Sequence, residues 1–260
     1  MTEPMYRQIA DDLERRIRAG EWAPDARLPT ELELRERYDA SRNTVRDAVK
    51  RLMSRGLIET RLGHGTFVVK KIAPFVTTLT TDPATGLGGG EGVVYTSQVE
   101  ASGREPTNSD PRVEIQKAPD YVARALRITE GEQVVSRHQE RNIDGDPWSL
   151  QTTWYPMDLV RRGASRLIEA TDIIEGTVVY LRERLGIIQV GYRDSIAVRP
   201  PDSNEVAYFG IPSDGRIAVF SIFRVGFGQD GYRFRLTITT YRVDRNRFVI
   251  NVGDVPDGEE

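Results

Sequence analysis

Four polar side chains in one short stretch are the best candidates for chemistry in this sequence: Arg42, Asn43, Arg46 and Lys50. Apolar residues recur between them at helical spacing, namely Val45, Ala48, Val49 and Leu52. In a helix the two sets lie on opposite sides, so one side can pack into a core while the other stays free. Guanidinium and amide groups donate paired hydrogen bonds to base edges in the major groove. The stretch is therefore typical of a helix that reads DNA.

The residues around this stretch predict a small unit of three helices. A first helix is expected over residues 4–19, because apolar residues recur there every four positions. Thr30, with a glutamate three positions later, forms a capping box that starts a second helix, which runs to about Tyr38. Ser41 is placed to cap the third helix, and Gly56 stands where a left-handed residue would end it.

A β-hairpin is predicted directly after the third helix. Its strands are residues 57–62 and 66–70, and its tip is Gly63-His64-Gly65. The two glycines stand where such a turn needs positive φ. The helices and the hairpin together predict a compact module that presents both a helix and a loop tip to a partner.

Charge is concentrated around the same module. Residues 42–71 contain eight basic and two acidic residues, in a chain whose formal net charge is −3. A basic segment in an otherwise acidic protein indicates a confined nucleic-acid contact, although a solvated helix face would have a similar composition. The chain has no cysteine, which excludes disulfides and thiolate metal sites. No apolar run approaches a membrane span and no secretion signal is evident, so we expect a cytoplasmic protein without a membrane partner.

The second half of the chain predicts a separate domain. Residues 72–91 are small, polar and glycine-rich, which predicts a flexible linker before a domain over 92–252, and residues 253–260 form an acidic tail. Two predicted hairpins pair 133–142 with 148–155 and 217–226 with 233–243. Further strands are expected at 187–199 and 248–252, and helices at 120–126, 159–170, 177–185 and 204–209. The fold class predicted for the chain is α+β, with helices that cover an antiparallel sheet.

Ordered motifs in the first 70 residues resemble the winged helix-turn-helix of the GntR superfamily of bacterial repressors. They are Leu28-Pro29-Thr30-Glu31, Ser41-Arg42-Asn43-Thr44-Val45-Arg46, Leu52 to Gly56-Leu57-Ile58, and Gly63 to Val68. The resemblance implies that the third helix enters the major groove and that the hairpin tip touches the minor groove. The residues that it implies for DNA binding are Thr30, Arg42, Asn43, Thr44, Arg46, Lys50, Gly63, His64 and Gly65.

One position departs from that family. Many relatives carry arginine where this chain has Leu32, and there the side chain contacts a phosphate or a base. Arg35 or Arg37, one helical turn further on, are candidates to replace it. The operator sequence is therefore harder to predict than the family itself.

Residues 93–252 resemble the effector-sensing UTRA domain of the HutC branch of this superfamily, which shares its fold with chorismate lyase. The matching pieces include Gly131-Glu132, Asp144-Gly145, Tyr155-Pro156, Gly176-Thr177, Leu185-Gly186 and Tyr241-Arg242. Relatives bind a small effector, often a phosphosugar or an organic acid, between the sheet and its covering helices. The resemblance implies no cofactor.

The effector-binding residues predicted for this chain lie mainly on one strand. Residues 137, 139 and 141 share a strand face, so Arg137, Gln139 and Arg141 are expected to converge on a ligand. The other candidates are Gln151, Thr177, Tyr180, Arg193 and Tyr241. Relatives often have a second arginine at 139 and a glutamate at 151. The two glutamines predict an effector that is more neutral or differently charged than a phosphate dianion.

Two classes of function follow. The first is a sequence-specific transcriptional regulator, a repressor whose operator binding is changed by a small molecule and which binds a pseudo-palindrome as a homodimer. The second is an enzyme on the chorismate-lyase-like fold with an accessory DNA-binding module. The enzyme hypothesis is weaker, because the only histidine outside the hairpin tip, His138, alternates to the opposite strand face from Arg137 and Gln139. No metal-ligand spacing or phosphate loop is present either.

Overall fold

The computed structural model of the protein describes residues 3–61, 63–69, 74–79, 92–211 and 217–250. The chain divides into two compact units, Met1–Ala73 and Pro74–Glu260, and each has a hydrophobic core of its own. The predicted acidic tail lies outside the described residues, as do positions 72–73 and 80–91 of the predicted linker.

The first unit contains the three helices and the hairpin that the sequence predicts. They are α1 (Met5–Arg18), α2 (Glu31–Tyr38), α3 (Arg42–Ser54), β1 (Ile58–Arg61) and β2 (Gly65–Val68), with β1 and β2 antiparallel. The capping box at Thr30 is complete, because the Thr30 side chain accepts from the Glu33 amide while the Glu33 carboxylate accepts from the Thr30 amide. Ser41 Oγ accepts from the Thr44 amide at 3.2 Å, and Gly56 has a φ of 65°. These predicted caps are confirmed.

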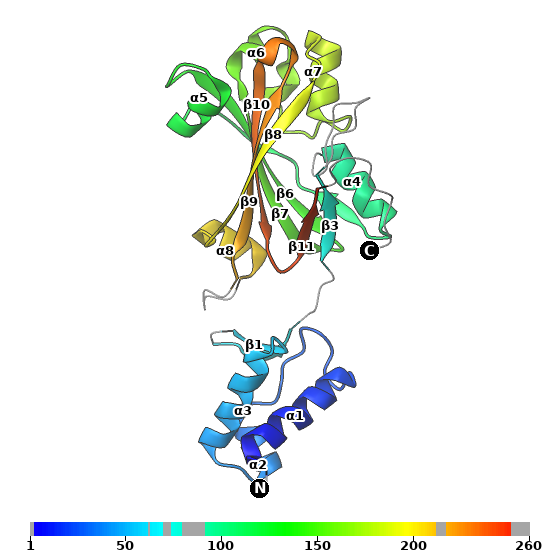
Figure 1. Ribbon diagram of the computed structural model, residues 1–260, viewed down its shortest axis with the longest axis vertical. Coiled ribbons are helices and arrows are strands. Elements are labelled where there is room, and N and C mark those ends of the chain that lie inside the picture. Colours follow the sequence, from blue (N-terminus) through cyan, green and yellow to red (C-terminus); the bar gives the residue numbers. More distant parts are fainter. Residues whose placement is uncertain (1–2, 62, 70–73, 80–91, 212–216, 251–260) are drawn as a thin grey trace. The chain divides into compact units, whose positions relative to one another are not determined.

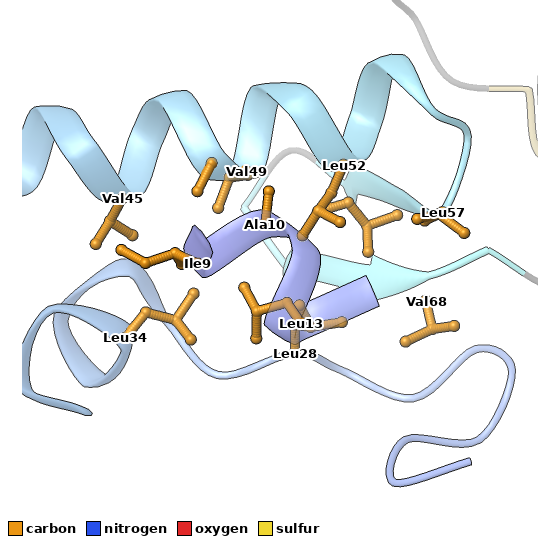
Figure 2. Packing of buried hydrophobic residues seen from close by; sticks show 12 residues of the cluster. Ile9, Ala10, Leu13, Leu28, Leu34, Val45, Val49, Leu52, Leu57 and Val68 are labelled. Atoms are coloured by element: carbon orange, nitrogen blue, oxygen red, sulfur yellow. The ribbon is translucent and has the colours of Figure 1, made fainter. Parts of the chain in front are cut away.

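A single apolar core holds the first unit together (Figure 2). Ile9 and Leu13 from α1 lie between Leu34 of α2 and Leu52 of α3. The hairpin closes the core with buried side chains such as Val68. Full burial of one such side chain contributes about 1.5–3 kcal/mol, so the core fixes the position of α3 relative to the other helices.

An antiparallel sheet of seven strands forms the centre of the second unit (Figure 1). Its strands are β4 (Pro106–Asn108), β5 (Arg112–Lys117), β6 (Gln133–Ile143), β7 (Asp146–Pro156), β8 (Gly191–Arg199), β9 (Val219–Phe227) and β10 (Arg233–Arg242). The strand order is β4-β6-β7-β10-β9-β8, and β5 also pairs with β6. A separate parallel pair joins β3 (Phe75–Thr78) to β11 (Asn246–Val249).

Helices cover both faces of this sheet. They are α4 (Gly92–Ala101), α5 (Asp120–Leu126), α6 (Met157–Arg161), α7 (Thr177–Leu185) and α8 (Ser203–Phe209), with short 3-10 turns η1 (Ser165–Ile168) and η2 (Gln229–Gly231). On one face α5 packs against Val225 and Leu236, whereas on the other α6 and α7 enclose Tyr155. No helix of the described chain is both long and apolar enough to cross a bilayer.

The structure corrects several predicted elements. Phe75–Thr78 lie inside the predicted linker but form β3. This strand pairs with β11, the last strand of the second unit in sequence order. The single helix predicted over 159–170 is divided into α6 and η1, because Gly163 adopts a φ of 115°, which a helix does not allow. The strand predicted over 187–199 begins at Gly191, and helix α4 and strands β4 and β5 were not predicted.

Candidate functional site

The outer side of α3 presents the predicted DNA-reading residues to solvent. Arg42, Asn43, Arg46 and Lys50 are exposed, while the apolar residues on the other side are buried. The Arg42 side chain is 72% exposed and lies 3.8 Å from Glu31, a distance that holds it only weakly. Arg46 makes no ion pair with any described residue. These guanidinium groups are therefore available to a partner.

Other arginines of the first unit are bound by acidic side chains. Arg55 forms ion pairs with Asp11 and Glu14, and Arg16 pairs with Glu21. These pairs connect α1 to its surroundings and neutralise that part of the surface. On α2 and α3, by contrast, Arg35, Arg37 and Arg46 make no ion pair with the described residues, although Arg61 of the hairpin pairs with Asp25 and Glu59. Exposed cations of this kind are expected at a DNA interface.

Two of the predicted DNA-binding hydroxyls have structural partners. Thr30 Oγ1 donates to Glu33 Oε2 at 2.8 Å within the capping box. Thr44 is half-buried and its Oγ1 lies 2.8 Å from Ser41 Oγ. Both residues thus stabilise helix starts, and a DNA contact through either hydroxyl would share these bonds.

The hairpin tip is shaped by its glycines and by a neighbouring arginine. Gly63 has a φ of 75° and Gly65 a φ of 113°, while His64 between them is exposed. A Cβ built on Gly65 would lie 2.7 Å from Arg27 Nε, so the absence of a side chain there leaves room for Arg27. Arg27 is exposed and makes no ion pair with the described residues, which places one more cation at the tip. Arg27 is not among the residues predicted from the sequence.

Position 32, where this chain has leucine instead of the arginine of many relatives, lies at the surface of α2. Leu32 is one of the exposed large apolar side chains of the protein. Arg35 and Arg37 on the same helix are exposed and make no ion pair within the described part of the chain. Both therefore stay candidates for the positive charge that position 32 lacks.

A cavity of about 310 Å³ opens in the second unit between the sheet and its covering segments. Its floor comes from β6, β7 and β10, and its walls come from the first half of α4 and from the segment 172–179, which includes the start of α7. Gln139, Arg141, Gln151 and Thr177 line it, so four of the eight predicted effector residues lie together.

The two glutamines lie side by side on the cavity floor. Gln139 and Gln151 are directly opposite each other in the β6–β7 pair. Gln139 Nε2 donates to Ser109 O at 3.2 Å and to Asp172 Oδ1 at 3.1 Å. Gln151 Oε1 accepts from Thr239 Oγ1 at 3.4 Å. The floor therefore offers amide groups where the family often has an arginine and a glutamate.

Arg141 lies at the end of the cavity that α4 closes. It is buried, and its guanidinium stands 5.0 Å from the ring centroid of Tyr95, a residue of α4. A Cβ on Gly92, the first residue of α4, would lie 4.0 Å from an Arg141 terminal nitrogen. The arginine and the N-terminal end of α4 thus bring positive charge to one part of the cavity.

Arg137 and Tyr180 do not line the cavity. Arg137 shares the strand face of Gln139, as predicted, but the chain around η1 covers it and leaves it 5% exposed. Its guanidinium donates to four backbone carbonyls, those of residues 166, 167, 169 and 171, at 2.7–3.1 Å. Tyr180 is buried in the core beneath α7, and its hydroxyl accepts from the Arg166 amide at 3.2 Å.

Arg193 and Tyr241 also lie away from the cavity. Arg193 is opposite Val225 in the β8–β9 pair, so it points to the sheet face that α5 covers. The cavity side of β8 is taken by its neighbour Asp194, which pairs with the buried Arg224 at 2.7 Å. Tyr241 is 2% exposed and packs edge-on against Phe248 at 5.2 Å. Neither residue lines the cavity.

Arg235 is a cavity residue that was not predicted from the sequence. It is buried on β10, lines the cavity, and donates to Gln189 Oε1 at 2.9 Å. A Cβ on Gly226, opposite Arg235 in the β9–β10 pair, would lie 2.9 Å from its Cγ, so the glycine makes room for it. The signal in the sequence is the alternation of Arg235, Thr237 and Thr239, polar residues that share one face of a buried strand.

Comparisons with known proteins agree with this division. Residues 5–68 match the model of bacterial regulatory proteins of the gntR family, and residues 101–247 match that of the UTRA domain. The chain is 25% identical over 248 residues to the HTH-type transcriptional repressor NagR of Bacillus subtilis, covering 95% of this chain and 93% of NagR. It is 30% identical over 160 residues to the mannosyl-D-glycerate transport/metabolism system repressor MngR of Escherichia coli, and that match spans 60% of each chain.

Solved structures show the same fold. PhnF from Mycobacterium smegmatis aligns over 94% of this chain and 99% of its own, with a TM-score of 0.57 and 24% identity. Its effector domain alone aligns over 62% of this chain at 26% identity and a TM-score of 0.52. Both relatives are named as repressors, which favours regulation over the enzyme alternative. The chain therefore belongs to the GntR family of bacterial transcriptional regulators and combines a winged helix-turn-helix domain with a UTRA domain.

Proposed function

We propose that this protein is a transcriptional repressor that binds operator DNA through α3 and the hairpin tip and whose affinity changes when a small effector occupies the UTRA cavity. The observation that carries the proposal is the exposed, weakly paired arginine face of α3, in the same chain as a cavity of about 310 Å³. The predicted residues that reach this face are Arg42, Asn43, Arg46 and Lys50. The cavity residues Gln139, Arg141, Gln151 and Thr177 are the effector contacts.

Gel-shift assays test this function directly. The probe is DNA from upstream of the gene that encodes the protein, since such regulators commonly control neighbouring operons. We expect a specific band that weakens steeply as salt rises, because phosphate contacts release counterions. A scrambled DNA of equal length is the control. Equal binding to both DNAs, or no band under any condition, would reject the repressor function.

Contacts around β3 support a route by which the cavity influences the DNA-binding unit. β3 begins two residues after the first unit ends, and its Phe75 packs edge-on against Tyr95 of α4 at 6.1 Å. Tyr95 also lies against Arg141, and the first turns of α4 line the cavity. A ligand that moves α4 would therefore act on the strand that follows the DNA-binding unit in the chain. Such a shared element is what coupling between two sites requires.

A homodimer is part of the proposal, because a pseudo-palindromic operator needs two DNA heads. The free edge of β8 supports a site for it. β8 is the last strand of the sheet and pairs only with β9 among the described strands. Residues 195–198 are exposed and uncharged, and they include Ile196 and Val198. An edge of this kind invites pairing with another strand unless a partner covers it.

We expect Ile196→Lys to convert the dimer into a monomer and to weaken binding to a two-half-site operator, because a charge in the edge opposes its burial. Size-exclusion chromatography with light scattering measures the mass. Ile115→Lys is the matched control. Ile115 is also exposed, but it belongs to β5, which pairs with β6 far from the β8 edge of the sheet. A monomer from Ile115→Lys, or a dimer from Ile196→Lys, would contradict the assignment to β8.

A further inference from the structure

A groove of about 520 Å³ opens on the surface of the first unit, beside the start of α2. Its lining, which we call the α2 groove, consists of Trp22, Arg27, Leu28, Pro29, Thr30, Glu33 and Arg37. Of the residues predicted for DNA binding, only Thr30 belongs to this lining. The groove is therefore a separate feature of the DNA-binding unit, and its charged side chains decide what it can hold.

Arg27 connects the α2 groove to the hairpin tip. Its backbone extends the hairpin sheet, because Arg27 pairs with Phe67 in an antiparallel bridge and the Leu28 amide donates to Thr66 O at 2.8 Å. Its side chain lies over Gly65, where a built Cβ would be 2.7 Å from Nε and 3.3 Å from Cζ. Backbone bonds thus fix the position of Arg27, and its guanidinium borders both the tip and the groove.

The cations of the α2 groove keep their donors for a ligand. Arg27 and Arg37 are exposed and make no ion pair with the described residues. The one carboxylate of the lining, that of Glu33, belongs to the capping box and accepts from the amide and the hydroxyl of Thr30 at 2.7 and 2.8 Å. The bonds from Thr30, with a smaller contribution from the charge of Arg27, keep the pKa of the Glu33 carboxyl below its usual value.

A second carboxylate near the groove is held by another arginine. Glu21 lies close enough to Arg37 to feel its charge, but Nε and Nη2 of Arg16 both donate to the Glu21 carboxylate. Arg16 also stands 4.8 Å from the ring centroid of Trp22, on the groove wall. Neither Glu21 nor the lining carboxylate therefore makes an ion pair with a groove arginine.

The α2 groove lies where a DNA backbone has to pass. When α3 occupies a major groove and the hairpin tip occupies the adjacent minor groove, one sugar-phosphate strand runs between the two elements. Arg27 lies beside the tip, and the start of α2 lies beside the start of α3, because Glu31 is 3.8 Å from Arg42. Guanidinium groups between these elements can bind phosphate oxygens through charge-assisted hydrogen bonds.

Given the proposed function, we propose that the α2 groove binds a phosphodiester of the DNA strand that separates the major from the minor groove, with Arg27 as the main cation and Arg37 as the second. Arg27 contacts a backbone phosphate and not a base edge. It therefore adds affinity that does not depend on the operator sequence.

Arg27→Ala and Arg27→Lys test this site in the full chain by fluorescence anisotropy. We expect Arg27→Ala to weaken operator and scrambled DNA alike by about five- to tenfold and to reduce the slope of log affinity against log salt by about one. Arg27→Lys should recover most of the affinity, because lysine also binds phosphate as a point charge. A loss confined to the operator, or no recovery in Arg27→Lys, overturns the proposal.

Arg15→Ala is the control for net charge. It removes an exposed arginine of α1 that pairs with Asp12 and does not line the α2 groove. We expect it to change the affinity by less than about twofold, because an exposed ion pair at a distance contributes little. A loss equal to that of Arg27→Ala overturns the proposal, since the effect would then follow from overall charge.

A neutral phosphate in the operator identifies the contact itself. Methylphosphonate replaces, one position at a time, the phosphates between the half-site and the flanking minor groove. At one position we expect the unmodified protein to bind about five- to tenfold more weakly and Arg27→Ala to show no further loss, because both changes remove the same contact. Additive losses at every position overturn the proposal.

Binding by the unmodified chain distinguishes this inference from the proposed function. Absence of specific binding to the operator rejects the repressor function. Specific binding that Arg27→Ala leaves unchanged, in both affinity and salt slope, rejects the phosphate site alone.

Discussion

Arg46→Ala is expected to lower operator affinity by about 5- to 150-fold, equivalent to roughly 1–3 kcal/mol, the range for one bidentate base contact. The reason is that Arg46 is exposed on α3 and makes no ion pair with the described residues, so its guanidinium is free to bind a base edge. Fluorescence anisotropy with a labelled operator measures the change. We also expect specificity at one base position to relax, which a set of single-base operator variants would show.

Two other substitutions show whether this effect is specific to the reading face. Arg18→Ala also removes an exposed arginine, but this arginine lies on α1 and pairs with Glu14 at 2.7 Å. It should leave operator affinity nearly unchanged. Lys50→Ala, at a position suited to a phosphate, should weaken all DNA sequences alike and reduce the salt slope by about one. Similar losses from Arg18→Ala and Arg46→Ala would mean that the arginines act only through overall charge.

The first unit could be predicted almost completely because its signals are local. Thr30 with Glu33, Ser41 and Gly56 each act within a few residues, and the structure places each in its predicted cap. The core side of α3 follows from helical spacing alone. Arg27 could not be predicted, because it reaches Gly65 only once the chain before α2 lies beside the hairpin.

The missed elements of the second unit depend on distant partners. β3 reads as part of a linker because it is only four residues long and is followed by a small, polar, glycine-rich stretch, yet it pairs with β11, which lies about 170 residues further along the chain. α4 begins with valines, Tyr95 and a threonine, residues that favour strands, and it is a helix in which Tyr95 and Val99, four positions apart, are both fully buried. Tertiary packing outweighs local preference in both places.

Four of the eight candidate effector residues line the cavity, and the other four lie elsewhere for a similar reason. Strand alternation correctly places Gln139 and Arg141 on one face, and both line the cavity. Alternation does not reveal which face of a distant strand meets that cavity. The structure places Arg193 on the opposite sheet face and its neighbour Asp194 on the cavity side. Alternation also does not reveal which residues of a face are covered by other segments. Arg137 lies on the same face as Gln139, but the chain around η1 encloses it.

That enclosure leads to a second large expected effect, on stability. Arg137→Met should destabilise the second unit by roughly 3 kcal/mol, because a buried guanidinium that serves several carbonyls is lost and methionine provides no donor. The carbonyls concerned belong to residues 166, 167, 169 and 171, which hold the segment between α6 and α7 against the sheet. Urea unfolding followed by the fluorescence of Trp148 and Trp154, both in this unit, measures the change.

Arg137→Lys and Arg193→Met complete this test. Lysine retains the charge but lacks the planar fork that reaches four carbonyls, so we expect an intermediate loss. Arg193 is exposed on the opposite sheet face, and Arg193→Met should change the free energy of unfolding by less than about 0.5 kcal/mol. If Arg137 were instead a ligand contact, Arg137→Met would leave unfolding unchanged and weaken effector binding alone. A loss of stability in Arg137→Met that is matched by Arg193→Met would likewise contradict the structural role, because the effect would then follow from removing any arginine of the sheet.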